Sequence, residues 1–142
     1  MQNAVAKLRS HGIHPSVQRI AIMDYVMKHL THPTVDDVYV ALSQSMPTLS
    51  KTTVYNTLRL FAECGAVRML TIDERKLCFD GCVEPHAHFI CRQCGRLMDV
   101  PLSEEARRLT VPHEETDCRI EETHLYYKGV CRKCLKKEQQ NN

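Results

Sequence analysis

Two Cys-x-x-Cys pairs carry the clearest chemistry in the sequence: Cys91 with Cys94, and Cys131 with Cys134. A tetrahedral zinc ion takes four thiolates, and a Cys-x-x-Cys turn directs two sulfurs toward one point while leaving backbone amides free to bond them. Gly95 follows the first pair directly and suits the tight turn of such a knuckle. The spacing therefore predicts one structural zinc site that closes the C-terminal half of the chain.

Unliganded thiols or a thioredoxin-like redox pair are the alternatives for these motifs. A single redox pair, however, does not explain why the chain has a second Cys-x-x-Cys pair. The chain has eight cysteines in total. Cys64 and Cys78 lie in apolar patterns, so we expect them to be core thiols. Cys82 and Cys118 receive no role from the sequence.

A second group of potential metal ligands lies just before the first cysteine pair and contains no sulfur. His86 and His88 form a His-x-His sequence. Imidazoles suit harder metals than thiolates do, so the chain offers one sulfur-rich set and one nitrogen-rich set. Two sets of different softness indicate two different functions.

Basic and small polar residues gather at the start of a predicted helix, namely Lys51, Thr52, Thr53, Tyr55, Asn56 and Arg59. A helix-turn-helix presents such side chains to the major groove of DNA. Lys51 and Arg59 are expected to bind phosphates, while Tyr55 and Asn56 suit contacts with base edges. An ordinary solvated helix face is the alternative, and the basic hairpin that follows favours DNA binding.

The elements around these residues describe an N-terminal winged helix-turn-helix. Apolar residues at helical spacing predict helices at 5–10, 16–30, 35–44 and 51–64. Ser16, Thr34 and Ser50 are the expected N-caps, and Gly65 is expected to end the fourth helix. Apolar residues flank the polar turn 73–75 and predict a β-hairpin over 67–79. A DNA-binding domain is thus expected at 1–80.

The C-terminal half has the pattern of a small α+β domain at 86–142, joined by a hinge at 81–85 that contains Gly and Pro. Short strands are predicted at 88–91, 97–100 and 120–127, and a helix at 103–109. Residues 136–142 look like a polar tail. The fold class predicted for the whole chain is α+β.

Composition limits the class of protein. The chain is 43% hydrophobic and 25% charged, which is ordinary for a globular protein, and its net charge of +2 does not by itself indicate nucleic acid. No apolar run approaches the roughly 18 residues of a membrane helix, and the first residues lack a secretory pattern. We therefore expect a cytoplasmic protein, in which cysteines favour metal binding over disulfides.

Three segments, 53–58, 86–95 and 127–131, together with the helix pattern, make nearly the whole chain resemble the ferric uptake regulator (Fur) family. The resemblance implies a homodimeric, metal-dependent transcription factor that binds promoter DNA. It also implies an N-terminal winged helix and a C-terminal dimerisation domain with a structural zinc.

By the same resemblance, a regulatory site draws ligands from both sides of the hinge, and the matching residues are His32, Asp80, His86, His88 and Asp99. Each alone has an ordinary explanation in a loop, a turn or a strand. Together, three imidazoles and two carboxylates suit Fe(II) or Mn(II), with Zn(II) as a competitor. Binding would fix the orientation of the two domains and thereby change the affinity for DNA.

Two features favour the peroxide-responsive branch of the family. Asp80 and Asp99 are both aspartates and Asn56 follows Tyr55, where iron-responsive members tend to have Glu and Arg. In the peroxide-responsive branch, peroxide reacts with bound Fe(II) and the resulting oxidant attacks a ligand histidine. His32 and His86 match the oxidised positions. An iron- or zinc-responsive regulator on the same scaffold is the alternative.

Other classes of protein fit less well. A zinc nucleobase deaminase also mixes histidine with Cys-x-x-Cys, but it needs His-x-Glu and a proline before the first cysteine, and this chain has neither there, so no enzyme is expected. A zinc-ribbon adaptor would bind proteins only and retain no DNA. Glu84 is a potential competing ligand, and His113 and His124 are imidazoles without an assigned role.

Overall fold

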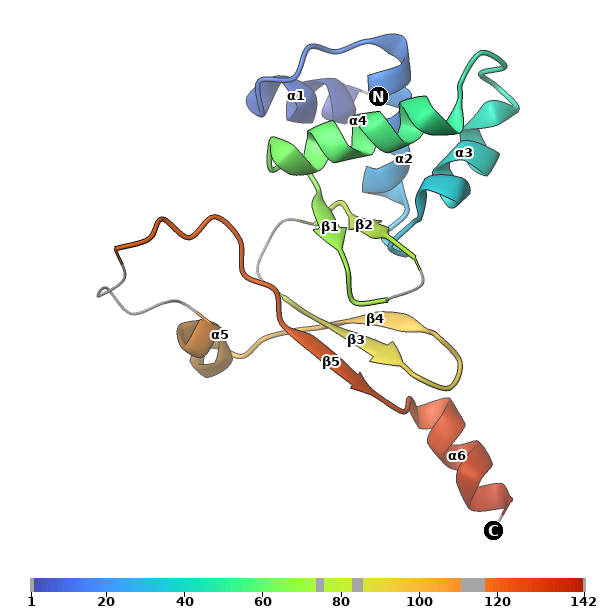
Figure 1. Ribbon diagram of the computed structural model, residues 1–142, viewed down its shortest axis with the longest axis vertical. Coiled ribbons are helices and arrows are strands. Elements are labelled where there is room, and N and C mark those ends of the chain that lie inside the picture. The colour runs from blue at the N-terminus through green and yellow to red at the C-terminus, as the bar shows by residue number, and fades with distance from the viewer. Residues whose placement is uncertain (1, 74–75, 83–85, 111–116, 142) are drawn as a thin grey trace. The chain divides into compact units, whose positions relative to one another are not determined.

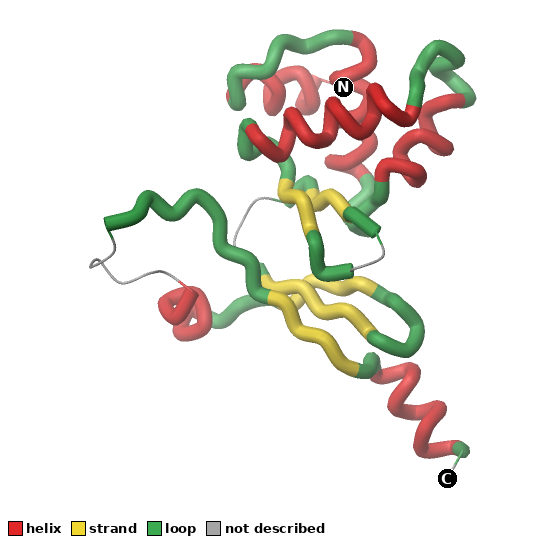
Figure 2. The backbone as a smooth tube through the Cα atoms, viewed as in Figure 1, coloured by secondary structure: helices red, strands yellow, loops and turns green. Residues whose placement is uncertain are grey.

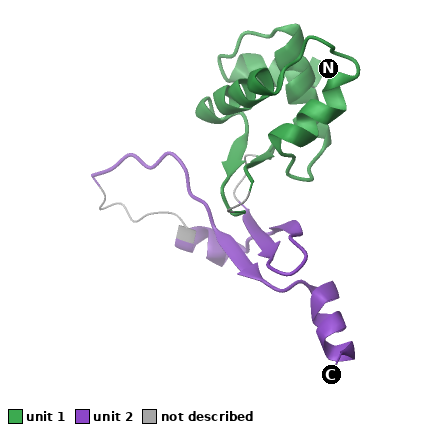
Figure 3. Cartoon of the chain, turned by 45° about the vertical axis from the view of Figure 1, so that its right-hand side comes forward, with its two compact units in different colours: residues 1–83 green, residues 84–142 purple. Residues whose placement is uncertain are grey.

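The computed structural model describes residues 2–73, 76–82, 86–110 and 117–141. The chain divides into two units, Met1–Val83 and Glu84–Asn142, coloured green and purple in Figure 3. Helices and small sheets occur in the predicted α+β combination. None of the helices in the described ranges combines the length and apolarity that crossing a membrane requires.

Four helices form the first unit: α1 Gln2–Ser10, α2 Val17–Lys28, α3 Val35–Ser43 and α4 Lys51–Glu63. Ser16, Thr34 and Ser50 cap the last three as predicted, each accepting a hydrogen bond from the backbone amide three residues on. Gly65 has φ +74°, a left-handed conformation that ends α4. Only α1 differs much from its prediction: it begins at Gln2, three residues before the predicted start, because its polar first turn has no apolar periodicity.

The core of this unit lies between the helices. Met23 and Val26 of α2 are fully buried, as are Leu58 and Phe61 of α4 and Val38 of α3. In Figure 1 a short connection joins α3 to α4, and these two helices pack against each other. They form the helix-turn-helix that the sequence predicts.

A two-stranded hairpin follows α4. Strands β1 Arg68–Leu70 and β2 Cys78–Asp80 pair antiparallel, and residues 74 and 75 of the predicted turn lie outside the described residues. The loop before α3 joins this hairpin, since Thr34 bridges to Cys78 and the amide of Phe79 donates to the Pro33 carbonyl at 2.9 Å. The loop that carries His32 is thereby fixed beside the strand that ends at Asp80.

The second unit contains a three-stranded sheet in the order β4-β3-β5, whose strands lie side by side in Figure 2. The central strand β3 Ala87–Cys91 pairs antiparallel with β4 Leu97–Val100 and parallel with β5 Tyr126–Gly129. Helix α5 Glu104–Thr110 lies between β4 and β5 in sequence. The last strand begins later than predicted, at Tyr126, and residues 117–123 before it are exposed.

Residues Arg132–Gln140 form helix α6, so most of the polar tail is helical, which the sequence analysis does not predict. Cys131 is its N-cap and Cys134 is its buried residue. The rest of the helix is nearly all polar, so no apolar period marked it in the sequence. A helix this short is marginal alone, and the cysteine pair at its start anchors it to the sheet.

Candidate metal centres

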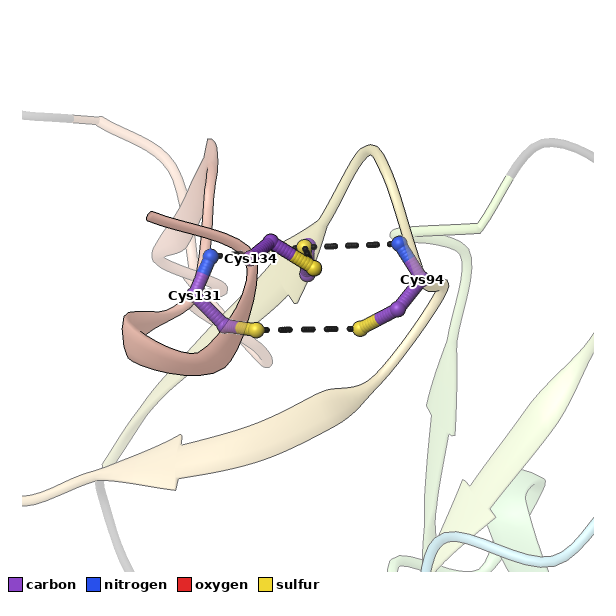
Figure 4. A group of neighbouring side chains, drawn as sticks. Cys94, Cys131 and Cys134 are labelled. Carbon is purple, nitrogen blue, oxygen red and sulfur yellow. Dashed lines mark hydrogen bonds between the residues drawn. The ribbon is translucent and has the colours of Figure 1, made fainter. Parts of the chain in front are cut away.

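The four predicted thiols come together in the second unit. Their Sγ atoms all lie within 4.8 Å of one another, with Cys94 to Cys131 at 3.7 Å and Cys91 to Cys134 at 3.8 Å. A tetrahedron with Zn–S bonds of about 2.3 Å has S–S edges of about 3.8 Å. Figure 4 shows the side chains of Cys94, Cys131 and Cys134 directed toward one another. The donor set and its spacing fit zinc.

Backbone geometry prepares this set for a cation. The amides of Cys94 and Cys131 donate to Cys91 Sγ at 3.5 and 3.3 Å, and these bonds lower the pKa of the Cys91 thiol to about 6. Burial raises the pKa of Cys134 to about 12. Without a metal the thiols therefore cannot all ionise together, whereas a divalent cation would compensate the four charges.

A sulfur-free set of donors lies on the sheet of the same unit. His88 in β3 is the register partner of Asp99 in β4, and its Nε2 is 3.3 Å from Asp99 Oδ1. His86, just before β3, places its own Nε2 3.2 Å from the same oxygen, and the two imidazole rings are 4.4 Å apart. His88 is only 1% exposed. Two imidazoles thus converge on one carboxylate, as in a facial set of metal ligands.

The remaining two predicted ligands form a buried pair in the first unit. His32 Nε2 lies 3.6 Å from Asp80 Oδ2, and the two residues are 6% and 2% exposed. The other oxygen of Asp80 accepts a hydrogen bond from the Cys82 amide at 2.9 Å. His32 has φ 59°, and a non-glycine residue keeps this left-handed conformation only when its surroundings hold it. The pairing of its loop with β2 supplies that restraint.

The predicted DNA-contacting residues lie at the start of α4. Lys51, Thr52, Tyr55, Asn56 and Arg59 are exposed, and Thr53 is half-buried. The opposite face of the helix is buried in the core.

Acidic neighbours pair with both basic residues of this helix. Lys51 Nζ is 3.2 Å from Asp36 and lies over the Tyr39 ring, while Arg59 is 3.2 Å from Glu63. Phosphate binding by either cation would therefore replace an exposed internal ion pair, which is weak.

The other cysteines are placed differently from one another. Cys78 is buried, as predicted, and burial raises the pKa of its thiol. The prediction for Cys64 is wrong: this thiol is exposed, because the residue is the C-cap of α4 and lies beyond the buried face. Cys118 is exposed and Cys82 is half-buried.

The unassigned residues show no third set of ligands within the described ranges. His124 Nε2 lies 3.2 Å from a Glu122 oxygen, and its Nδ1 lies 3.2 Å from the Tyr126 hydroxyl. Glu84 and His113 lie outside the described residues.

Comparison with known proteins places these features in context. The model of the Ferric uptake regulator family matches residues 10–128. The peroxide-responsive repressor PerR of Staphylococcus aureus strain Mu50 is 37% identical over 139 residues, which is 96% of this chain and 93% of that protein. The peroxide operon regulator of Bacillus subtilis strain 168 is 36% identical over 140 residues, covering 97% and 95%.

Solved structures agree in fold. A structure described as the basis for peroxide sensing by PerR from Streptococcus pyogenes is 27% identical, with a TM-score of 0.51 over 93% of this chain and 90% of that one. The ferric uptake regulator of Pseudomonas aeruginosa with manganese has a TM-score of 0.75, at 21% identity, over 91% and 98%. The second likeness bears on the fold alone.

Proposed function

The chain belongs to the ferric uptake regulator family, and from this premise we propose that it is a metal-dependent, DNA-binding transcriptional repressor that senses hydrogen peroxide. The observation that carries the proposal is the convergence of His86 and His88 on one oxygen of Asp99. A set of this kind binds a redox-active ion such as Fe(II) and leaves open positions for a small oxidant. The relatives named above, both peroxide regulators, support peroxide as the signal.

The two donor sets have separate functions in this proposal. Cys91, Cys94, Cys131 and Cys134 hold a structural zinc, because four thiolates satisfy a tetrahedral ion and leave no position for a ligand to enter. This ion stabilises the second unit and takes no part in sensing.

The regulatory ion, Fe(II) or Mn(II), is assigned to His32, Asp80, His86, His88 and Asp99. The pair in the first unit offers two donors and the set in the second offers three, and each is fewer than such an ion takes. Two aspartates and three neutral imidazoles also balance a double positive charge. Since the ligands lie on both sides of residues 83–85, one ion binding all five would restrict how the two units are oriented, and so select the conformation that binds DNA.

Fe(II), when bound, would mediate the two-electron reduction of peroxide, and the electrons that break the O–O bond would come in the end from the imidazole that is oxidised. His32 and His86 are the side chains we assign to oxidation, in which the imidazole gains one oxygen atom and the second oxygen of peroxide leaves as water. An oxidised ring is a poorer donor, so the ion is lost and the repressor releases DNA. Mn(II) in the same place makes the protein far less sensitive to peroxide.

The DNA-binding surface is assigned to the exposed start of α4, with Lys51 and Arg59 on phosphates and Tyr55 and Asn56 at base edges. The protein acts on promoter DNA as a homodimer, works in the cytoplasm with the chromosome, and catalyses no reaction on an external substrate. The dimer contributes two recognition helices to one operator.

Mass spectrometry of the peroxide-treated protein tests the proposal. The Fe(II) form should gain one oxygen on the tryptic peptides that contain His32 or His86, and should lose DNA affinity in step. The Mn(II) form should gain none, and the peptide with His124 serves as an internal control in both. An Fe(II) form that keeps unmodified peptides and full DNA affinity would contradict peroxide sensing and leave the iron-responsive alternative.

A further inference from the structure

The side chain of Lys7, in the first helix, contacts a residue near the C-terminal end of the same unit. Its Nζ donates a hydrogen bond to the Gly81 carbonyl at 2.8 Å, across 74 positions of sequence. The side chain is half-buried on α1, and its ammonium interacts electrostatically with Asp80 and Cys82. Ordering and partly desolvating a long cationic side chain is unfavourable, so the contact must be specific enough to offset that loss.

The segment that Lys7 holds is the turn that orients Asp80. Within this turn, the Cys82 amide donates a hydrogen bond to Asp80 Oδ1 at 2.9 Å. The other carboxylate oxygen, Asp80 Oδ2, lies 3.6 Å from His32 Nε2. Movement of the turn would rotate the carboxylate, because its Oδ1 is tied to the turn's own backbone.

The same turn lies against helix α2. A Cβ on Gly81 would come within 3.0 Å of the Val26 carbonyl oxygen and 3.2 Å of Val26 Cγ1. Both contacts are tight, so a methyl group at Gly81 would press on the backbone and side chain of Val26. The turn is thus in contact with α2 and is also bonded by the Lys7 ammonium.

We propose that Lys7 is a positioning residue for the regulatory ion: it holds the Gly81 carbonyl so that Asp80 presents Oδ2 beside His32. The inference rests on the proposed function, in which Asp80 and His32 are ligands. Groups that orient metal ligands without touching the ion set its affinity by about 10- to 100-fold. By linkage, the bound ion in turn stabilises the docking of α1.

A purely electrostatic role for Lys7 predicts the opposite sign. A positive charge near the site repels a divalent ion, so removing it would tighten binding. Loss of a positioning contact weakens binding instead. The direction of the change therefore distinguishes the two.

The test is the Mn²⁺ affinity of the full-length, zinc-loaded protein. Lys7→Met should weaken Mn²⁺ binding about tenfold or more, while Lys7→Arg, which keeps a long cationic donor, should restore most of it. Lys28→Met is the matched control, since Lys28 is an exposed lysine that pairs with Asp24 on its own helix. An affinity for Mn²⁺ in Lys7→Met equal to or tighter than wild type overturns the proposal.

A second variant reaches the same turn from the α2 side. Gly81→Ala leaves Lys7 in place, and it should also weaken Mn²⁺ binding while the zinc content stays unchanged. If Lys7→Met fails to fold, Gly81→Ala and Lys7→Arg serve as the test. Wild-type Mn²⁺ affinity in Gly81→Ala would count against Lys7 as a positioning residue. So would a loss of Mn²⁺ affinity in Lys7→Arg as large as the loss in Asp80→Ala.

Hydrogen exchange separates positioning from general stabilisation. Mn²⁺ should slow amide exchange in α1 of the wild type and of Lys7→Arg, but not of Lys7→Met. Slowing of equal size in Lys7→Met would contradict the proposal.

The variant Asp99→Ala, in the second unit, tests the proposed function separately from the role of Lys7. Normal Mn²⁺ affinity in Asp99→Ala would show the regulatory site to be misassigned. Lost Mn²⁺ binding in Asp99→Ala beside normal binding in Lys7→Met would overturn the role of Lys7 alone.

Discussion

The conformation and hydrogen bonds of single residues determine how closely each group of potential metal ligands is ordered for binding an ion. His32 occupies a left-handed conformation, and Asp80 divides its two oxygens between a backbone amide and an imidazole. The type and spacing of these residues led to their selection through family resemblance. Their burial and backbone strain had no sequence signal, because both depend on the pairing of the His32 loop with a strand far along the chain. The exposure of Cys64 was hidden for a similar reason, since an apolar pattern does not show where the buried face ends.

Gly95 supplies a prediction at this scale. Its φ is +75° and a Cβ there would meet no atom within 4 Å, so Gly95→Ala introduces backbone strain and nothing else. We expect a loss of about 1 kcal/mol in the free energy of unfolding, with faster zinc release to a chelator. Gly12→Ala is the control, because Gly12 has φ +71° and equally open surroundings, in the unit without cysteine ligands. Zinc release as slow as in wild type would show that the knuckle does not need this conformation.

Elements formed as predicted where a local signal defined them, and differently where it did not. Helices α2, α3 and α4 have caps and an apolar period, and each begins at the residue after its predicted cap. Helix α6 begins at Cys131, whose side chain makes no capping hydrogen bond, and the helix has no apolar period. Strand β5 forms by pairing with β3, and α6 follows the cysteine pair at its start. The sequence thus predicted most of the first unit and only part of the second.

Helix α3 gives a prediction at the scale of elements. Thr34 and Asp37 form a capping box with bonds of 3.1 and 2.9 Å, whereas Ser16 caps α2 through one bond of 3.3 Å. Thr34→Ala removes the bond that the Asp37 amide donates and keeps the bond from the Thr34 backbone amide to the Asp37 carboxylate. We expect it to destabilise the protein by about 1 kcal/mol, and Ser16→Ala, whose cap bond is longer, to cost less. Urea unfolding of the two variants measures the difference. Equal losses would show that the shorter cap bond of Thr34 contributes no more than the longer one of Ser16.

At the scale of the molecule, the two units differ in what holds them together. The first has an extensive apolar core drawn from four helices. Among the described residues of the second unit, Cys91, Cys131 and Cys134 form a buried cluster, and the partly buried Phe89, Met98 and Val130 pack against it. Thiols make up much of this small cluster, so we expect zinc to supply much of the stability of the unit.

Zinc removal should accordingly unfold one unit and spare the other. With a strong chelator, amides of β3 to β5 and α6 should lose protection from hydrogen exchange, while those of α2 and α4 keep it. Added zinc should restore the pattern. Uniform loss of protection along the whole chain would mean that the two units unfold together.

Strand β3 carries a ligand of each proposed metal site, His88 and Cys91. His88 and Cys91 lie three positions apart on one strand, so they occupy opposite faces of the sheet. Deleting or inserting one residue between them would put both on the same face and so misplace either the imidazole or the thiol. The number of residues between His88 and Cys91 is therefore fixed, so we expect relatives to show no gap at residues 89 and 90.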